Sequence, residues 1–227
     1  MSLQVPARAT LQKSLAETLE RQLMPPTVST PQKIDDFHEL LGEVRKCTLC
    51  AAHLPLGPRP VLQIHPGARI LIAGQAPGRK VHETGIPFND VSGDRLRAWL
   101  GVSRDQFYDP SRVAILPMGF CFPGTGKSGD LPPRAECAAA WRRRLLDELN
   151  KVQLTLAIGA YAVAFHLPEE RGSLADIVQG WRRHWPTIVP IPHPSPRNIR
   201  WLKRNPWFEA GILPALRQRV AALMAES

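Results

Sequence analysis

The amino-acid sequence predicts an α/β fold, a three-layer α/β/α sandwich around a central, mostly parallel sheet of about four strands. Four short runs are almost entirely apolar, which is typical of strands buried on both faces. They span residues 68–74, 113–118, 154–159 and 187–192. Segments with helical patterns separate them, and an alternation of strands and helices indicates a parallel sheet covered by helices.

The predicted helices follow in chain order. Before the first strand, apolar residues at helical spacing predict one buried helix face: Ile34, Phe37, Leu40, Leu41 and Val44. Later helices are expected in SGDRLRAWLG, which would end at Gly101, in PPRAECAAAWRRRLLDELNKV, in AYAVAFHL, and after Asn205 and Pro206. We expect residues 34–227 to form a single domain, preceded by a loosely ordered arm over residues 1–33.

The composition favours an anionic partner. The 227 residues include 29 Lys and Arg against 20 Asp and Glu, a formal net charge of +9. Such an excess of positive charge makes nucleic acid the leading candidate. No apolar run approaches the roughly 20 residues of a membrane span, and the first residues lack the apolar core of a secretory signal. We therefore expect a cytoplasmic monomer that does not bind membranes.

The four cysteines suggest a metal centre. Cys47 and Cys50 form a CxxC pair, and Cys121 and Cys137 follow far along the chain. In a reducing compartment, such a set suits a four-thiolate site that holds an iron–sulfur cluster or zinc. Inert buried thiols are the alternative that the spacing leaves open.

Two loops carry groups that a plain connector does not need. GQAPGRKVHETGIPFNDVSGD (74–94) follows the first strand and joins a tight glycine turn to polar residues: Gln75, His82, Glu83, Asn89 and Asp90. Within it, Phe88 is either a core residue or a platform for a flat ligand. The second loop, HPSPRN, is stiffened by prolines around His193, which is either part of a site or a surface imidazole. Loops beyond the carboxyl ends of parallel strands share one edge of the sheet, so these two loops should meet.

These pieces together resemble the uracil-DNA glycosylase superfamily over roughly residues 40–215. GQAPG with TGIPF and SGDRL resembles the first motif of the iron–sulfur branch, family 4. CTLC with FCFPG and LPPRAEC resembles the cluster ligands of that branch, and HPSPRN resembles the second motif. The resemblance implies a [4Fe–4S] cluster on Cys47, Cys50, Cys121 and Cys137, with zinc as the alternative.

The resemblance also implies a reaction. Such an enzyme flips a nucleotide out of DNA and hydrolyses its N-glycosidic bond, which starts base-excision repair. It is monofunctional, and His193 donates a hydrogen bond to the departing uracil. The resemblance further implies that a first set of residues binds the base: Gly74, Gln75, Ala76, Phe88 and Asn89. A second set contacts the DNA: Ser195, Arg197, Asn198, Arg200 and Lys203.

The first motif departs from its relatives in its acids. Gln75 stands where family 4 has Glu, and Ala76 stands where family 1 has Asp. The nearest remaining carboxylates are Glu83 and Asp90, of which we prefer Asp90 because family 5 places an Asp just after the same Phe. His82 is a further candidate for positioning water, or else a surface histidine.

Substrate range and activity stay open at this point. ILPMGFC has no amide side chain where relatives place an Asn to read uracil. Other deaminated bases such as xanthine or hypoxanthine are therefore expected substrates, unless Asn89 takes over the reading of uracil. The missing acids also leave a second function class, a non-catalytic iron–sulfur protein that binds nucleic acid. Release of free base from an oligonucleotide separates the two.

Overall fold

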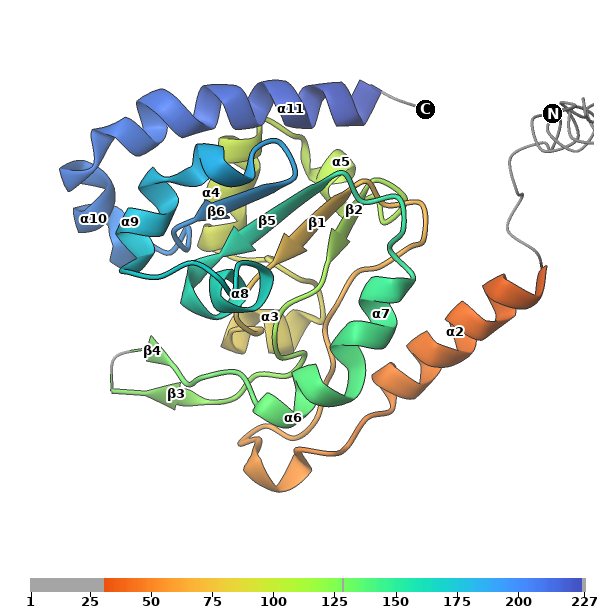
Figure 1. The fold of residues 1–227 in the computed structure, drawn as a ribbon. Helices are drawn as coiled ribbons and strands as arrows, with labels where there is room; N and C mark the ends of the chain where they lie inside the picture. Colours follow the sequence, from red (N-terminus) through yellow and green to blue (C-terminus); the bar gives the residue numbers. More distant parts are fainter. Residues whose placement is uncertain (1–30, 128, 226–227) are drawn as a thin grey trace, which may run out of the picture. The chain divides into compact units, whose positions relative to one another are not determined.

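The computed structural model describes residues 31–127 and 129–225 (Figure 1). Its central sheet has the strand order β2-β1-β5-β6, and each neighbouring pair is parallel. The strands are β1 (Ile70–Ala73), β2 (Val113–Ile115), β5 (Leu154–Ile158) and β6 (Ile188–Ile191). Each strand lies inside one of the four predicted apolar runs, which confirms the predicted sheet. β6 tolerates Pro190 because it lies at the edge of the sheet.

The helices cover both faces of the sheet (Figure 1). The α-helices are α2 (Pro31–Arg45), α3 (Arg79–Thr84), α4 (Val91–Leu100), α5 (Arg104–Tyr108), α6 (Ala135–Cys137), α7 (Arg143–Asp147), α8 (Gly159–His166), α9 (Leu174–Gln179), α10 (Ile199–Arg204) and α11 (Leu213–Ala225). Short 3₁₀ helices are η1 (Ala51–His53), η3 (Trp181–His184) and η4 (Pro196–Asn198), and π-helical turns are η2 (Ala138–Arg142) and η5 (Phe208–Ile212). No helix in the described part of the chain has the length and apolar character needed to cross a bilayer.

The two faces of the sheet pack against different layers. Leu154, Leu156 and Ile158 of β5 belong to a large buried cluster that also contains residues of α4, η5 and α11. Ala157 belongs to a smaller cluster on the other face, with Ala162 of α8. Side chains alternate along a strand, so neighbours in sequence face opposite layers. This arrangement confirms the predicted three-layer sandwich.

The predicted division into an N-terminal arm and a single domain stays a prediction. The predicted arm over residues 1–33 lies mostly outside the described residues, but α2 already begins at Pro31, ahead of the predicted boundary. By its contacts, the chain divides into a unit of residues 1–40 and a compact unit of residues 41–227. Every residue predicted for the site belongs to the second unit.

Sequence patterns did not predict a small hairpin that follows β2. Its strands are β3 (Thr125–Gly126) and β4 (Gly129–Asp130), which pair in antiparallel fashion. Two-residue strands with two glycines leave no apolar alternation to recognise. Likewise, the loop after β6 is less irregular than predicted, because residues 196–198 of HPSPRN form η4 and lead into α10.

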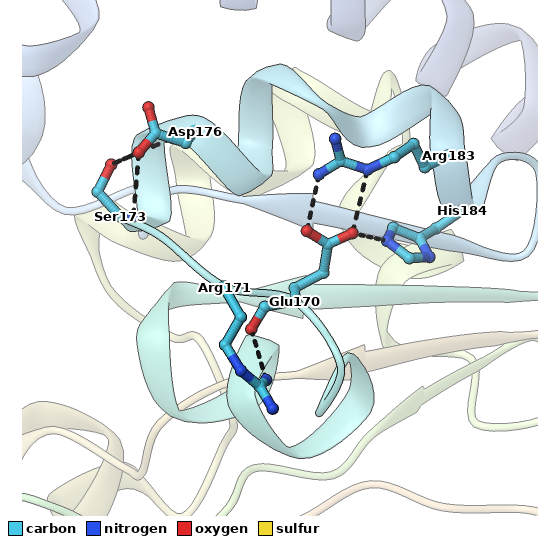
Figure 2. Close-up of polar contacts among 6 residues, drawn as sticks. All are labelled: Glu170, Arg171, Ser173, Asp176, Arg183 and His184. Carbon is cyan, nitrogen blue, oxygen red and sulfur yellow. Dashed lines mark hydrogen bonds and ion pairs between the residues drawn. The ribbon is translucent and has the colours of Figure 1, made fainter.

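The entry to β6 is held by a polar network (Figure 2). The Glu170 carboxylate accepts from Arg183 Nη2 at 2.7 Å and Nε at 3.1 Å, and pairs with His184 Nε2 at 2.7 Å. Hydrogen bonds from His184 and Arg183 lower the pKa of Glu170. Ser173 and Asp176 form a capping box that starts α9. The network therefore positions the strand that delivers the HPSPRN loop.

A buried arginine holds the chain where it leaves β2. Arg142 is fully buried, and its Nη1 donates to the carbonyl oxygens of Leu116 at 2.8 Å and Pro117 at 2.9 Å. Its Nη2 lies 2.7 Å from His166 Nε2, and because a guanidinium only donates, His166 accepts as a neutral ring. Burial and the Arg142 charge lower the pKa of His166 to about 4.

This pair predicts acid sensitivity. Between pH 6.5 and 4, His166 is protonated in the unfolded state but neutral in the folded state. The free energy of unfolding therefore falls as pH falls through that window, by up to about 3 kcal/mol. Above pH 6.5 the pair contributes no pH dependence. Urea unfolding at pH 7, 5 and 4 should show a smaller acid loss for His166→Gln, whose amide oxygen still accepts from Arg142. Equal pH dependence of the two proteins would contradict this account.

Candidate active site

A cavity of about 560 Å³ lies at the carboxyl edge of the sheet. Its walls come from the loop after β1, the segment after β2, the β3–β4 hairpin and the loop after β6. The residues predicted for the site that line it are Gly74, Gln75, Ala76, Phe88, Asp90, His193, Ser195, Arg197 and Asn198. The two predicted loops therefore meet at one cavity, as the parallel sheet requires.

Phe88 is held in an unusual conformation. Its φ of 52° is positive, which no other non-glycine residue among those described shows. Such a conformation costs about 1–3 kcal/mol and is often found at functional sites. The ring packs edge-on against Phe107, and the Phe88 carbonyl oxygen accepts from Arg97 Nη1 at 3.4 Å. One face of the ring is thereby left toward the cavity and His193.

The Phe88 and His193 rings face each other across the site. Their centroids are 6.5 Å apart and their planes differ by 27°. Two stacking contacts would need about 7 Å. The separation is therefore slightly less than a flat ligand stacked on both rings would need.

His193 is oriented as a neutral hydrogen-bond donor. Its Nδ1 accepts from the Ser195 amide at 3.2 Å, which leaves the proton on Nε2. Asn198 Nδ2 donates to the His193 carbonyl oxygen at 2.8 Å and tightens the same turn. Burial lowers the pKa of His193, opposed by the charges of Asp90 and Asp130. The ring is therefore uncharged at neutral pH and has one N–H to offer.

Two carboxylates line the cavity. Asp90 caps α4 by accepting from the Gly93 amide at 2.9 Å. Asp130, on β4, was not among the predicted site residues, although it also lines the cavity. The one sequence signal for it is a polar residue directly after a glycine turn in the segment that follows Cys121.

Three of the residues predicted for catalysis or base binding do not line the cavity. His82 is buried on the inner face of α3, with its ring 6.3 Å from that of Phe122 and its Nδ1 without a hydrogen-bond partner. Burial, with the nearby charge of Arg59, lowers its pKa. Glu83 is exposed one position along α3. The Asn89 Oδ1 accepts from Arg104 Nη2 at 3.0 Å, which points the amide toward α5.

The four cysteines line a second, smaller cavity. Two of the sulfur atoms accept hydrogen bonds: Cys47 Sγ from Trp141 Nε1 at 3.1 Å and Cys137 Sγ from the Phe120 amide at 3.3 Å. Burial raises the pKa of Cys121 to about 11 and that of Cys137 to about 12. Sulfur atoms that accept N–H hydrogen bonds suit thiolates bound to a cation, because the cation removes their protons. Within residues 31–127 and 129–225, no group of three or more potential ligands is arranged to hold a single ion.

Comparison with known proteins identifies the family. Residues 63–217 match the model of the Uracil DNA glycosylase superfamily. The chain belongs to the uracil-DNA glycosylase superfamily. It is also similar to the Type-4 uracil-DNA glycosylase of Thermotoga maritima, with 28% identity over 170 residues that cover 71% of this chain and 83% of the relative. The resemblance seen in the motifs is thereby confirmed.

Gln75, which stands where family 4 has Glu, makes hydrogen bonds that a glutamate could not make. Gln75 Nε2 donates to the carbonyl oxygens of Leu131 at 2.9 Å and Asp130 at 3.5 Å. A glutamate at position 75 has no donor for these carbonyl oxygens. Gln75 therefore joins the first-motif loop to the β3–β4 hairpin.

The basic segment after the second motif is a helix. Arg200 and Lys203 on α10 are exposed and lie outside the cavity lining. Trp201 instead packs inward, with its ring 5.7 Å from Trp207 and 6.0 Å from Phe208. The helix thus presents charge to solvent next to the cavity loop and uses its aromatic ring as an anchor.

Proposed function

We propose that this protein is a DNA glycosylase that hydrolyses the N-glycosidic bond of uracil in DNA and so initiates base-excision repair. The observation that carries the proposal is the pair of rings, Phe88 and His193, that face each other across one cavity. The nucleotide is flipped out of the helix, which costs a few kcal/mol of unstacking. Its base stacks on Phe88.

In this proposal His193 stabilises the leaving base. As the glycosidic bond breaks, negative charge develops on a uracil carbonyl oxygen, and the Nε2–H of His193 donates to that oxygen. The Ser195 and Asn198 contacts hold the imidazole in place before the reaction, so no ordering cost arises during it. Asp90 stands at the cavity wall with one carboxylate oxygen free of the Gly93 amide, and its charge offsets the cationic sugar.

The chemistry is monofunctional. A glycosylase that also cleaves the strand uses an amine to attack the sugar. No described residue that lines the cavity is a lysine. Hydrolysis by water is therefore the reaction that the lining supports.

DNA is held by the second-motif loop and α10. Ser195, Arg197 and Asn198 line the cavity mouth, where they follow the flipped nucleotide into the groove. Arg200 and Lys203 add exposed positive charge for the phosphates. Affinity should therefore fall steeply with salt.

Release of free base from uracil-containing oligonucleotides tests the proposal. The matched control is the same oligonucleotide with thymine in place of uracil. A protein that binds both but releases no base of any kind would be the non-catalytic nucleic-acid-binding protein instead. Oligonucleotides with hypoxanthine and xanthine test the broader range, which strict selectivity for uracil would rule out.

We propose that Cys47, Cys50, Cys121 and Cys137 hold a [4Fe–4S] cluster. The four thiols line one small cavity, and the Cys47 and Cys137 sulfur atoms accept N–H hydrogen bonds, as the thiolates that hold a cluster would. The cluster supplies a structural link between segments far apart in sequence and takes no part in the hydrolysis.

The iron and sulfide content of Cys137→Ser tests the proposed cluster. We expect purified wild type to carry iron and sulfide with visible absorption, and Cys137→Ser to lose most of both and to melt at a lower temperature. Ser111→Ala, which leaves all four thiols in place, should keep the iron. A colourless wild-type protein that holds zinc and no iron would overturn the assignment.

A further inference from the structure

We infer that Asp130 is the carboxylate that activates the attacking water, an inference that rests on the proposed glycosylase activity. Asp90 and Asp130 are the two carboxylates among the described residues that line the cavity. Each uses one carboxylate oxygen in a hydrogen bond, Asp90 with the Gly93 amide and Asp130 with Thr125, but Asp90 is half-buried. Asp130 belongs to the exposed hairpin, where water reaches it freely.

The Asp130 carboxylate is turned toward the first-motif loop. Its Oδ1 accepts from Thr125 Oγ1 at 3.2 Å, across the β3–β4 pair. Its Oδ2 lies only 3.3 Å from the point that a Cβ on Gly78 would occupy. Glycine at position 78 thus leaves room for the carboxylate at the cavity wall.

The first-motif and second-motif loops both contact the hairpin that carries Asp130. Gln75, from the first-motif loop, donates to the backbone oxygens of Leu131 and Asp130. Arg197, from the second-motif loop, lies against Gly129, where its Nη1 is 2.2 Å from the position of an added Cβ. Position 75 lacks an acid, but its amide positions the hairpin that carries Asp130. Asp130 thus supplies a carboxylate in place of the missing one.

The C1′–N bond breaks and its electron pair leaves with the base, whose carbonyl oxygen receives the hydrogen bond from His193. The water oxygen forms the new bond to C1′, and the Asp130 carboxylate takes the water proton. That proton then passes to solvent, and the base anion is protonated in turn.

Asp130→Ala tests the inference under single-turnover conditions with a uracil-containing oligonucleotide. We expect the rate to fall by about 10²–10³, the range typical of a lost general base, while DNA binding and the melting temperature stay near wild type. Added formate, a small carboxylate, should restore part of the lost rate. Asp147→Ala, at an exposed aspartate of α7 outside the cavity lining, should leave the rate unchanged.

Two results would overturn the assignment of Asp130 and leave the proposed function intact. One is a rate for Asp130→Ala within about threefold of an active wild type, far short of a general-base loss. The other is a slow variant that formate does not rescue and that melts early, because this pattern indicates a structural role. A wild type that releases no base fails the proposed function itself.

Discussion

His193→Ala is expected to lower the rate of uracil release by about 10²–10³, the cost of removing one preorganised donor to a developing anion. The structure leaves His193 with a single N–H, because its Nδ1 accepts from the Ser195 amide. The pKa of the ring is lowered by burial, so a neutral donor is present at neutral pH. DNA binding should survive, because the imidazole contributes no charge to it. Single-turnover release and a binding titration on the same oligonucleotide measure the two effects.

The sequence offers a matched control for His193. His65 also accepts, through its Nδ1, from an amide two residues along, that of Gly67 at 3.0 Å, but it is exposed and outside the cavity. His65→Ala should therefore keep the wild-type rate. Equal rates for His193→Ala and wild type would remove His193 from the reaction.

Gly93→Ala is expected to destabilise the protein by about 2–3 kcal/mol and to slow base release as well. An added Cβ at position 93 would lie 1.7 Å from the Phe88 carbonyl oxygen, so the backbone of one segment has to move. The Phe88 carbonyl oxygen accepts a hydrogen bond from Arg97, and Phe88 already has a positive φ. The strain therefore falls on Phe88, the residue on which the base is proposed to stack. Helix propensity alone would predict the opposite result, because alanine is favoured over glycine inside a helix by about 1 kcal/mol.

Urea unfolding measures this effect against Gly211→Ala. Gly211 lies in the helical turn η5, and a Cβ there meets no atom within 4 Å. That variant should be as stable as wild type or more stable, by about 0.4–1 kcal/mol. Similar stabilities for Gly93→Ala and Gly211→Ala would show that the contact with Phe88 relaxes freely.

Local sequence patterns do not predict which of the three arginines at 142–144 is buried. Arg142 is fully buried, whereas Arg143 and Arg144 are exposed. The π-helical turn η2 ends at Arg142 and shifts the helix register at the start of this run, so a count at helical spacing cannot select the buried member. In the same way, the adjacent residues His82 and Glu83 were both candidates, and only the packing of α3 decides that neither lines the cavity.

The sequence by itself determined the sheet, the edge at which the functional loops meet, and the roles open to Phe88 and His193. Apolar runs and motif loops are local features, and parallel strands bring their carboxyl ends to one side. Only the tertiary structure showed that Asp130 lines the cavity and that Gln75 holds the hairpin that carries Asp130. Those contacts link segments about 55 residues apart, through backbone oxygens that carry no sequence signal. The fold follows from short-range patterns, whereas the placement of the second acid depends on how a small hairpin returns to the first loop.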